Sequence, residues 1–148
     1  MQNQFNWPLW HWHFEVSSIC TLQCPRCPRT EIPGSLVQTQ LKLDFFKNNF
    51  DIDGIGKITF CGDDGDPIYA RDFIEIVRWF KQKDPTIGIS IVTNGSYKSA
   101  DWWKELGSVL NQHDQVHFSL DGFDQASNEK YRVNCNWDSI IEGVHSLR

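Results

Sequence analysis

The sequence lacks any long apolar run and any concentration of positive charge. No stretch approaches the roughly 20 apolar residues that span a bilayer, and residues 1–4 lack the charged-then-apolar layout of a signal peptide. The 148 residues contain 14 lysines and arginines, scattered along the chain, against 19 aspartates and glutamates, which gives a formal net charge of -5. These absences argue against a membrane protein and against a nucleic-acid partner. We expect one globular domain in the cytoplasm.

Cysteines are few and unevenly placed. There are five, an odd number, and three of them, Cys20, Cys24 and Cys27, fall within eight positions. Cys61 and Cys135 stand alone, so the second pair that a four-cysteine zinc or iron-sulfur site uses is missing. An odd, clustered set predicts thiolate ligands in a reducing compartment and not a disulfide framework.

The spacing of the three clustered cysteines predicts a metal site. A loop this short can bring three sulfurs to one point, and prolines after Cys24 and Cys27 stiffen it. The simplest interpretation is a cluster with three thiolate ligands and one position open to a substrate or cosubstrate. Two alternatives stay open: a zinc knuckle that takes His11 or His13 as its fourth ligand, or cysteines that only pack.

The hydrophobic pattern predicts strands that alternate with helices. We expect strands at residues 11–17, 57–60, 88–92 and 115–120, and helices at 44–49, 69–83, 99–110 and from 136 onward. The helix at 69–83 has the clearest apolar face, and Asp44 is the expected cap of the short one. This alternation predicts an α/β fold with a parallel sheet and right-handed crossovers.

The loops that follow the predicted strands should meet at one edge of the sheet, where such folds bind ligands. Gly62 and Gly65 would let the second loop turn tightly, and Asp66 offers a carboxylate for an ammonium group. The same loop could instead be a plain acidic turn or a weak divalent-cation site. Thr93 and Asn94 precede a glycine in a turn of a very common type.

The pattern Cys-x3-Cys-x2-Cys resembles the signature of the radical S-adenosylmethionine (radical SAM) superfamily. The resemblance implies that Cys20, Cys24 and Cys27 bind a [4Fe-4S] cluster whose fourth iron is chelated by the amino and carboxylate groups of SAM. It also implies a partial (β/α) barrel, of which this chain would supply about four of six units. Arg26 stands where the family has an aromatic residue that helps to seat the adenine.

Further segments resemble motifs of the same family. The loop that ends at Asp66-Pro67 is similar to a glycine-rich loop ending in Gly-Glu-Pro, with aspartate in place of glutamate. The resemblance implies that Gly62, Gly65 and Asp66 contact the SAM amino group, that Thr93 and Asn94 line the SAM pocket, and that Ser119 and Asp121 reach the ribose hydroxyls. Ser119 and Asp121 could also be caps. Arg132 is expected to be structural, with contact to the substrate as the less favoured alternative, and Cys61 and Cys135 are expected to take no part in the site.

The implied activity is reductive cleavage of SAM to a 5'-deoxyadenosyl radical, which removes hydrogen from a substrate. Flavodoxin or ferredoxin would donate the electron. The cysteine loop and the Ser-Leu-Asp-Gly segment most resemble enzymes that act on peptides or proteins. Residues 1–148 would form the N-terminal part of the core domain, completed by a C-terminal segment or a second chain.

Two other function classes compete with this enzyme. One is a non-catalytic iron-sulfur or zinc scaffold domain, or an inactive fragment. The other is a flavodoxin-like or Rossmann nucleotide binder, which is disfavoured because no Gly-x-Gly-x-x-Gly follows the first strand.

Overall fold

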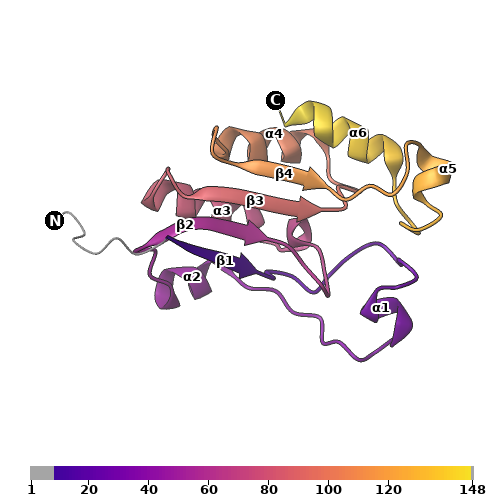
Figure 1. The fold of residues 1–148 in the computed structure, drawn as a ribbon, viewed down its shortest axis with the longest axis horizontal. Coiled ribbons are helices and arrows are strands. Elements are labelled where there is room, and N and C mark those ends of the chain that lie inside the picture. The colour runs from indigo at the N-terminus through magenta and orange to yellow at the C-terminus, as the bar shows by residue number, and fades with distance from the viewer. Residues whose placement is uncertain (1–8, 148) are drawn as a thin grey trace.

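Four parallel strands form one sheet in the order in which they occur along the chain. The computed structural model describes residues 9–147. The strands are β1 (Trp10–Phe14), β2 (Ile55–Phe60), β3 (Gly88–Thr93) and β4 (Gln115–Phe118). Neighbouring strands are parallel throughout, and the sheet order is β1-β2-β3-β4 (Figure 1). The predicted α/β class with a parallel sheet is therefore confirmed.

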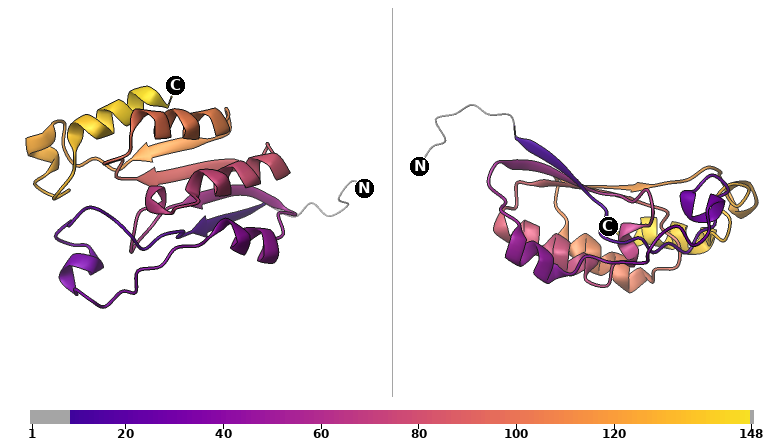
Figure 2. Two further views of the ribbon diagram at one scale, coloured as in Figure 1. Left: turned by 180° about the vertical axis from the view of Figure 1, so that it is seen from behind. Right: turned by 90° about the horizontal axis from the view of Figure 1, so that it is seen from below.

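The longer helices cover a single face of this sheet. The helical segments are α1 (Pro28–Glu31), α2 (Leu43–Asn49), the 3-10 turn η1 (Pro67–Tyr69), α3 (Phe73–Lys83), α4 (Ala100–Val109), α5 (Gln125–Asn128) and α6 (Trp137–Ser146). Helices α2, α3, α4 and α6 lie on one side of the sheet, and the short α1 and α5 lie beyond its carboxyl edge (Figure 2). In the part of the chain that the structure describes, no helix has both the length and the apolar character that crossing a membrane requires.

Several predicted boundaries are wrong by a few residues. Helix α3 begins at Phe73 and not at residue 69, because residues 67–69 form a separate turn that Asp66 caps by accepting a hydrogen bond from the Ile68 amide. Asp44 lies inside the first turn of α2 and is not its cap, since the helix already begins at Leu43. Strands β1 and β4 end earlier than predicted, at Phe14 and Phe118.

The core lies between the sheet and its covering helices. Side chains alternate across a strand, so Phe60 of β2 and Ile91 of β3 point toward the helices, where both are fully buried. Phe80 of α3 contacts Phe46 and Phe60 in edge-to-face and tilted pairs with ring centroids 5.5 and 6.2 Å apart. Such aromatic pairs add to the free energy that burial contributes. This packing fixes the strands whose ends carry the loops of the site.

The opposite face of the sheet is mostly polar and carries no helix among the described residues. Its side chains include the polar residues His11, His13, Lys57, Thr59, Ser90, Gln115 and His117 and one apolar residue, Val92, which pairs with His117. His11 Nε2 lies 2.8 Å from Thr59 Oγ1, and His13 Nδ1 lies 4.0 Å from Cys61 Sγ. The two histidines therefore interact with neighbouring strand residues on this face.

We expect Phe80→Ala to lower the free energy of unfolding by about 3–5 kcal/mol, because a fully buried ring would leave a cavity. Phe123→Ala is the matched control, since its ring is 82% exposed, and we expect a change within about 0.5 kcal/mol. Denaturant unfolding followed by circular dichroism measures both values. Equal losses in the two variants would contradict the core described above.

Candidate functional site

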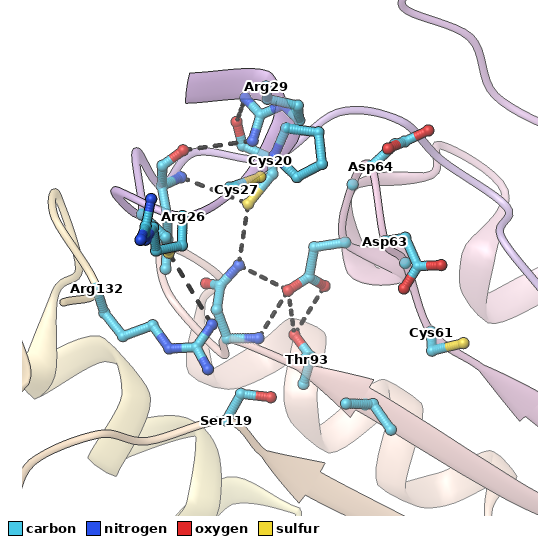
Figure 3. A pocket seen from close by; sticks show the side chains of 18 of the residues that line it. Cys20, Arg26, Cys27, Arg29, Cys61, Asp63, Asp64, Thr93, Ser119 and Arg132 are labelled. Atoms are coloured by element: carbon cyan, nitrogen blue, oxygen red, sulfur yellow. Dashed lines mark hydrogen bonds between the residues drawn. The ribbon is translucent and has the colours of Figure 1, made fainter. Parts of the chain in front are cut away.

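A cavity of about 390 Å³ opens where the loops after all four strands meet. Its wall includes Cys20, Cys24, Arg26, Cys27, Gly62, Gly65, Asp66, Thr93, Asn94 and Ser119, all of them predicted site residues, together with Cys61 and Arg132 (Figure 3). Asp121 is the one predicted site residue that does not line it. Residues separated by more than a hundred positions thus share one wall, because parallel strands end at the same edge of a sheet.

The cysteine loop is held in shape by its own backbone and by one arginine. The Cys27 amide donates to the Cys24 carbonyl at 3.1 Å, and Pro28 begins helix α1 directly after Cys27. From that helix, the Arg29 guanidinium donates to the carbonyls of Cys20 at 2.9 Å and Leu22 at 3.3 Å. Leu22 is buried under the loop and anchors it to a small apolar cluster. The loop is therefore preorganised at its first and last cysteines.

All three clustered cysteines are free thiols, and each is partly exposed to the cavity. Burial raises the pKa of the Cys20 thiol above its usual value. Within residues 9–147, no group of three or more His, Cys, Asp or Glu side chains stands close enough together to hold one metal ion. The convergence of the three sulfurs on one cluster stays a prediction.

This arrangement fits a cluster better than a zinc ion. A single zinc ion needs four ligands around one point, and the histidines considered as the fourth ligand lie on the polar face of the sheet beside Thr59 and Cys61. A [4Fe-4S] cluster takes one thiolate for each iron that the protein ligates, so its ligands surround a larger object. Three free thiols around one cavity match that requirement.

Asp66 is buried in the cavity wall, with 5% of its surface exposed. Its carboxylate accepts hydrogen bonds from the Thr93 hydroxyl at 2.8 Å, from the Asn94 amide nitrogens of backbone and side chain at 2.6 Å each, and from the Ile68 amide at 3.2 Å. Burial raises the pKa of Asp66 to about 6, although these hydrogen bonds act in the opposite direction. The carboxylate predicted to meet an ammonium group is thus largely occupied by the chain itself.

The two glycines of the second loop are required by contacts within the protein. A Cβ atom at Gly65 would lie 2.0 Å from the Ser17 carbonyl oxygen, and one at Gly62 would lie 2.5 Å from the Gly65 carbonyl oxygen. Backbone atoms cannot yield to that degree. The predicted close approach at these glycines is real, but it is made by the loop to itself and to the chain that follows β1.

Arg132 was expected to be structural, yet the structure places it in the cavity wall. Its guanidinium pairs with the carboxylate of Asp121, and its Nη1 lies 4.0 Å from Cys24 Sγ. Asp121 therefore reaches the cavity only through Arg132. No sequence motif marked this arginine, and its position depends on how the loop after β4 folds around α5.

The other arginine and cysteine side chains of this region lie at the cavity rim, in its wall or in the protein interior. Arg26 is at the rim, where its side chain is 80% exposed and pairs with Glu31. Cys61 lines the cavity, and burial, followed by the nearby carboxylates of Glu15 and Asp63, raises its thiol pKa. Cys135 does not line the cavity; it is buried beside Asn128, in the small apolar cluster against which Cys20 and Cys24 pack.

Comparison with known proteins finds relatives that are named for reactions of nucleotides. The chain is 30% identical to GTP 3',8-cyclase of Lactiplantibacillus plantarum over 135 residues, which are 87% of this chain and 39% of that protein. It is 25% identical to S-adenosylmethionine-dependent nucleotide dehydratase RSAD2 of Siniperca chuatsi, covering 92% of this chain and 38% of the relative. The chain thus spans less than half the length of these relatives.

A solved structure shares the fold. Native anSMEcpe with bound AdoMet and Cp18Cys peptide superposes with a TM-score of 0.62 at 19% identity, over 93% of this chain and 39% of the other. The family model described as "Radical SAM superfamily" matches residues 14–148, which include the whole cysteine loop and all of the loops around the cavity. Members of that family are enzymes that bind a [4Fe-4S] cluster and SAM. The chain therefore belongs to the radical SAM superfamily.

Proposed function

We propose that Cys20, Cys24 and Cys27 hold a [4Fe-4S] cluster in the cavity at the carboxyl edge of the sheet, with SAM beside it. The observation that carries this proposal is the shared wall: three free thiols from one loop face the loops after β2, β3 and β4 across one cavity. A non-catalytic scaffold would need only the thiols. The additional polar wall favours an enzyme that also binds a cosubstrate.

Held by Cys20, Cys24 and Cys27, a reduced [4Fe-4S] cluster would supply the one electron for reductive cleavage of SAM to methionine and a 5'-deoxyadenosyl radical, which would take hydrogen from a substrate. The chain's own residues would bind SAM and orient it. The Arg132 guanidinium is the cation in the wall next to Cys24, and it suits the SAM carboxylate. Thr93 and Asn94 line the proposed SAM pocket and hold the Asp66 carboxylate in its wall. Ser119 offers a hydroxyl from the end of the neighbouring strand, and Arg26 lies at the rim near the position proposed for adenine.

We further propose that residues 1–148 are the N-terminal part of the core domain and supply four of six βα units. The uncovered polar face of the sheet would then be the inner wall of a partial barrel, closed by a C-terminal segment or by a second chain. Flavodoxin or ferredoxin is the proposed electron donor, since both carry single electrons at low potential.

The substrate is proposed to be a polar small molecule of the nucleotide class. The relatives with 25–30% identity are named for GTP and for nucleotides, and the inner face offers His11, His13, Lys57 and His117 as hydrogen-bond donors. A peptide is the second candidate, supported by the cysteine-loop resemblance and by the peptide bound to the structural neighbour.

We expect Cys20→Ala to abolish binding of a four-iron cluster, because one of three thiolates is lost. After anaerobic reconstitution the unaltered chain should contain about four iron and four sulfide per chain, with an EPR signal that changes when SAM is added. Cys135→Ala is the matched control and should retain the iron. One zinc per chain, with no response to SAM, would instead support the scaffold domain.

Replacing the cavity arginine should weaken SAM binding without removing the cluster. We expect Arg132→Ala to raise the Kd for SAM about 10- to 100-fold, the range for a lost hydrogen-bonded charge. Arg26→Ala should change it less than about fivefold, because that guanidinium is exposed. Isothermal titration under anaerobic conditions measures both, and equal effects would contradict the proposed role of Arg132.

The substrate proposal predicts which compound accelerates SAM cleavage. With reconstituted chain, SAM and a chemical reductant, we expect GTP to increase the rate of 5'-deoxyadenosine formation more than a cysteine-containing peptide does, since the inner face is polar. Chromatography quantifies the product, and Cys20→Ala gives the background. Acceleration by the peptide alone would reverse the order of the two candidates.

A further inference from the structure

The side-chain amide of Asn94 lies between Cys20 and Asp66. Its Nδ2 is 3.5 Å from Cys20 Sγ and 2.6 Å from Asp66 Oδ2, so its NH₂ group, with two hydrogens, has two acceptors. Asn94 is 5% exposed and follows β3 directly. A buried amide from the third strand thus reaches a sulfur of the first loop.

Three further contacts fix the orientation of this amide. The Ser96 backbone amide donates to Asn94 Oδ1 at 2.9 Å, which identifies the oxygen end. The Asn94 backbone amide donates to the same Asp66 oxygen as the side chain does, at 2.6 Å, and Thr93 holds that carboxylate from the neighbouring position. A flipped amide would turn its oxygen toward a carboxylate and a sulfur, and would place its NH₂ group against the Ser96 N–H donor.

The three cysteine sulfurs differ in the donors around them. Cys20 Sγ has two donors, Asn94 Nδ2 and the Leu22 backbone amide, each at 3.5 Å. Cys24 Sγ has Arg132 Nη1 at 4.0 Å, and among residues 9–147 no donor within hydrogen-bonding distance is found for Cys27 Sγ. Cys20 is therefore the sulfur best placed to receive hydrogen bonds from the protein.

We propose that Asn94 sets the reduction potential of the cluster by donating a hydrogen bond to the Cys20 thiolate, and that Asp66 is the positioning residue that holds the amide in place. The inference rests on the proposed function. Reduction adds negative charge that is shared by the cluster and its thiolates, so a donor at a sulfur stabilises the reduced form and raises the potential. Asp66 would then serve the cluster indirectly, in addition to lining the SAM cavity.

The test compares midpoint potentials of reconstituted protein in anaerobic titrations followed by EPR. We expect Asn94→Ala to shift the potential to more negative values, because the donor to Cys20 is gone. Ser96→Ala is the matched control: its side chain is equally buried and only accepts from the Asn136 amide at 3.3 Å, so the potential should stay at the unaltered value.

A second variant and a second spectroscopic measurement keep the test valid if Asn94→Ala does not fold. Asn94→Ser is smaller and keeps a polar group near the Ser96 amide, and it should give the same negative shift if Asn94→Ala does not fold. In the unaltered protein, electron-nuclear double resonance in H₂O and D₂O should show exchangeable protons of both the Leu22 amide and the Asn94 side chain coupled to the reduced cluster. The Asn94 coupling should be missing in either variant, while the Leu22 coupling remains.

The outcomes separate this inference from the proposed function. A cluster that forms in all variants with an unchanged potential and an unchanged proton coupling overturns the role of Asn94 and leaves the enzyme proposal intact. If no iron-sulfur cluster forms in the reconstituted chain, the proposed function is overturned, and this inference is overturned with it.

Discussion

The buried carboxylate of Asp66 joins the loop after β2 to the loop after β3, and the shape of the cavity depends on this connection. It accepts hydrogen bonds from Thr93 and Asn94 at distances down to 2.6 Å. Burial raises the pKa of this carboxyl group, and the hydrogen bonds lower it, which leaves the pKa at about 6. Through Asn94 the same network extends to Cys20, so scaffold and proposed ligand are parts of one hydrogen-bonded unit.

The two faces of the sheet divide the work of the molecule. On one face, apolar side chains of β2 and β3 pack under α3 and α4 and hold the strands in register. On the other, polar side chains stand in rows and lead toward the cavity at the carboxyl edge. This division follows from the alternation of side chains along a strand. The residues that stabilise the fold lie on one face of the sheet, and the polar residues proposed to face the substrate lie on the other.

Much of the fold was predictable because its signals are local. Alternation and helical spacing located all four strands and the four longer helices, and the cysteine spacing located the first loop. Helix starts were less predictable, since the turn at residues 67–69 depends on a cap that only the folded loop supplies. The place of Arg132 in the cavity and the internal partners of Asp66 could not be read from the sequence, because each depends on contacts between segments more than 25 residues apart.

The contact between Gly65 and the Ser17 carbonyl oxygen limits how this site can vary in evolution. With no room for a Cβ atom there, the second loop lies directly against the chain that leads into the cysteines, and the Asp66 amide holds it there by donating to the Ile19 carbonyl at 3.0 Å. An aspartate at position 66 is one methylene shorter than the glutamate of related loops. Adaptation to that shorter side chain must therefore come from the residues that reach across to it, and not from a shift of the loop that carries it.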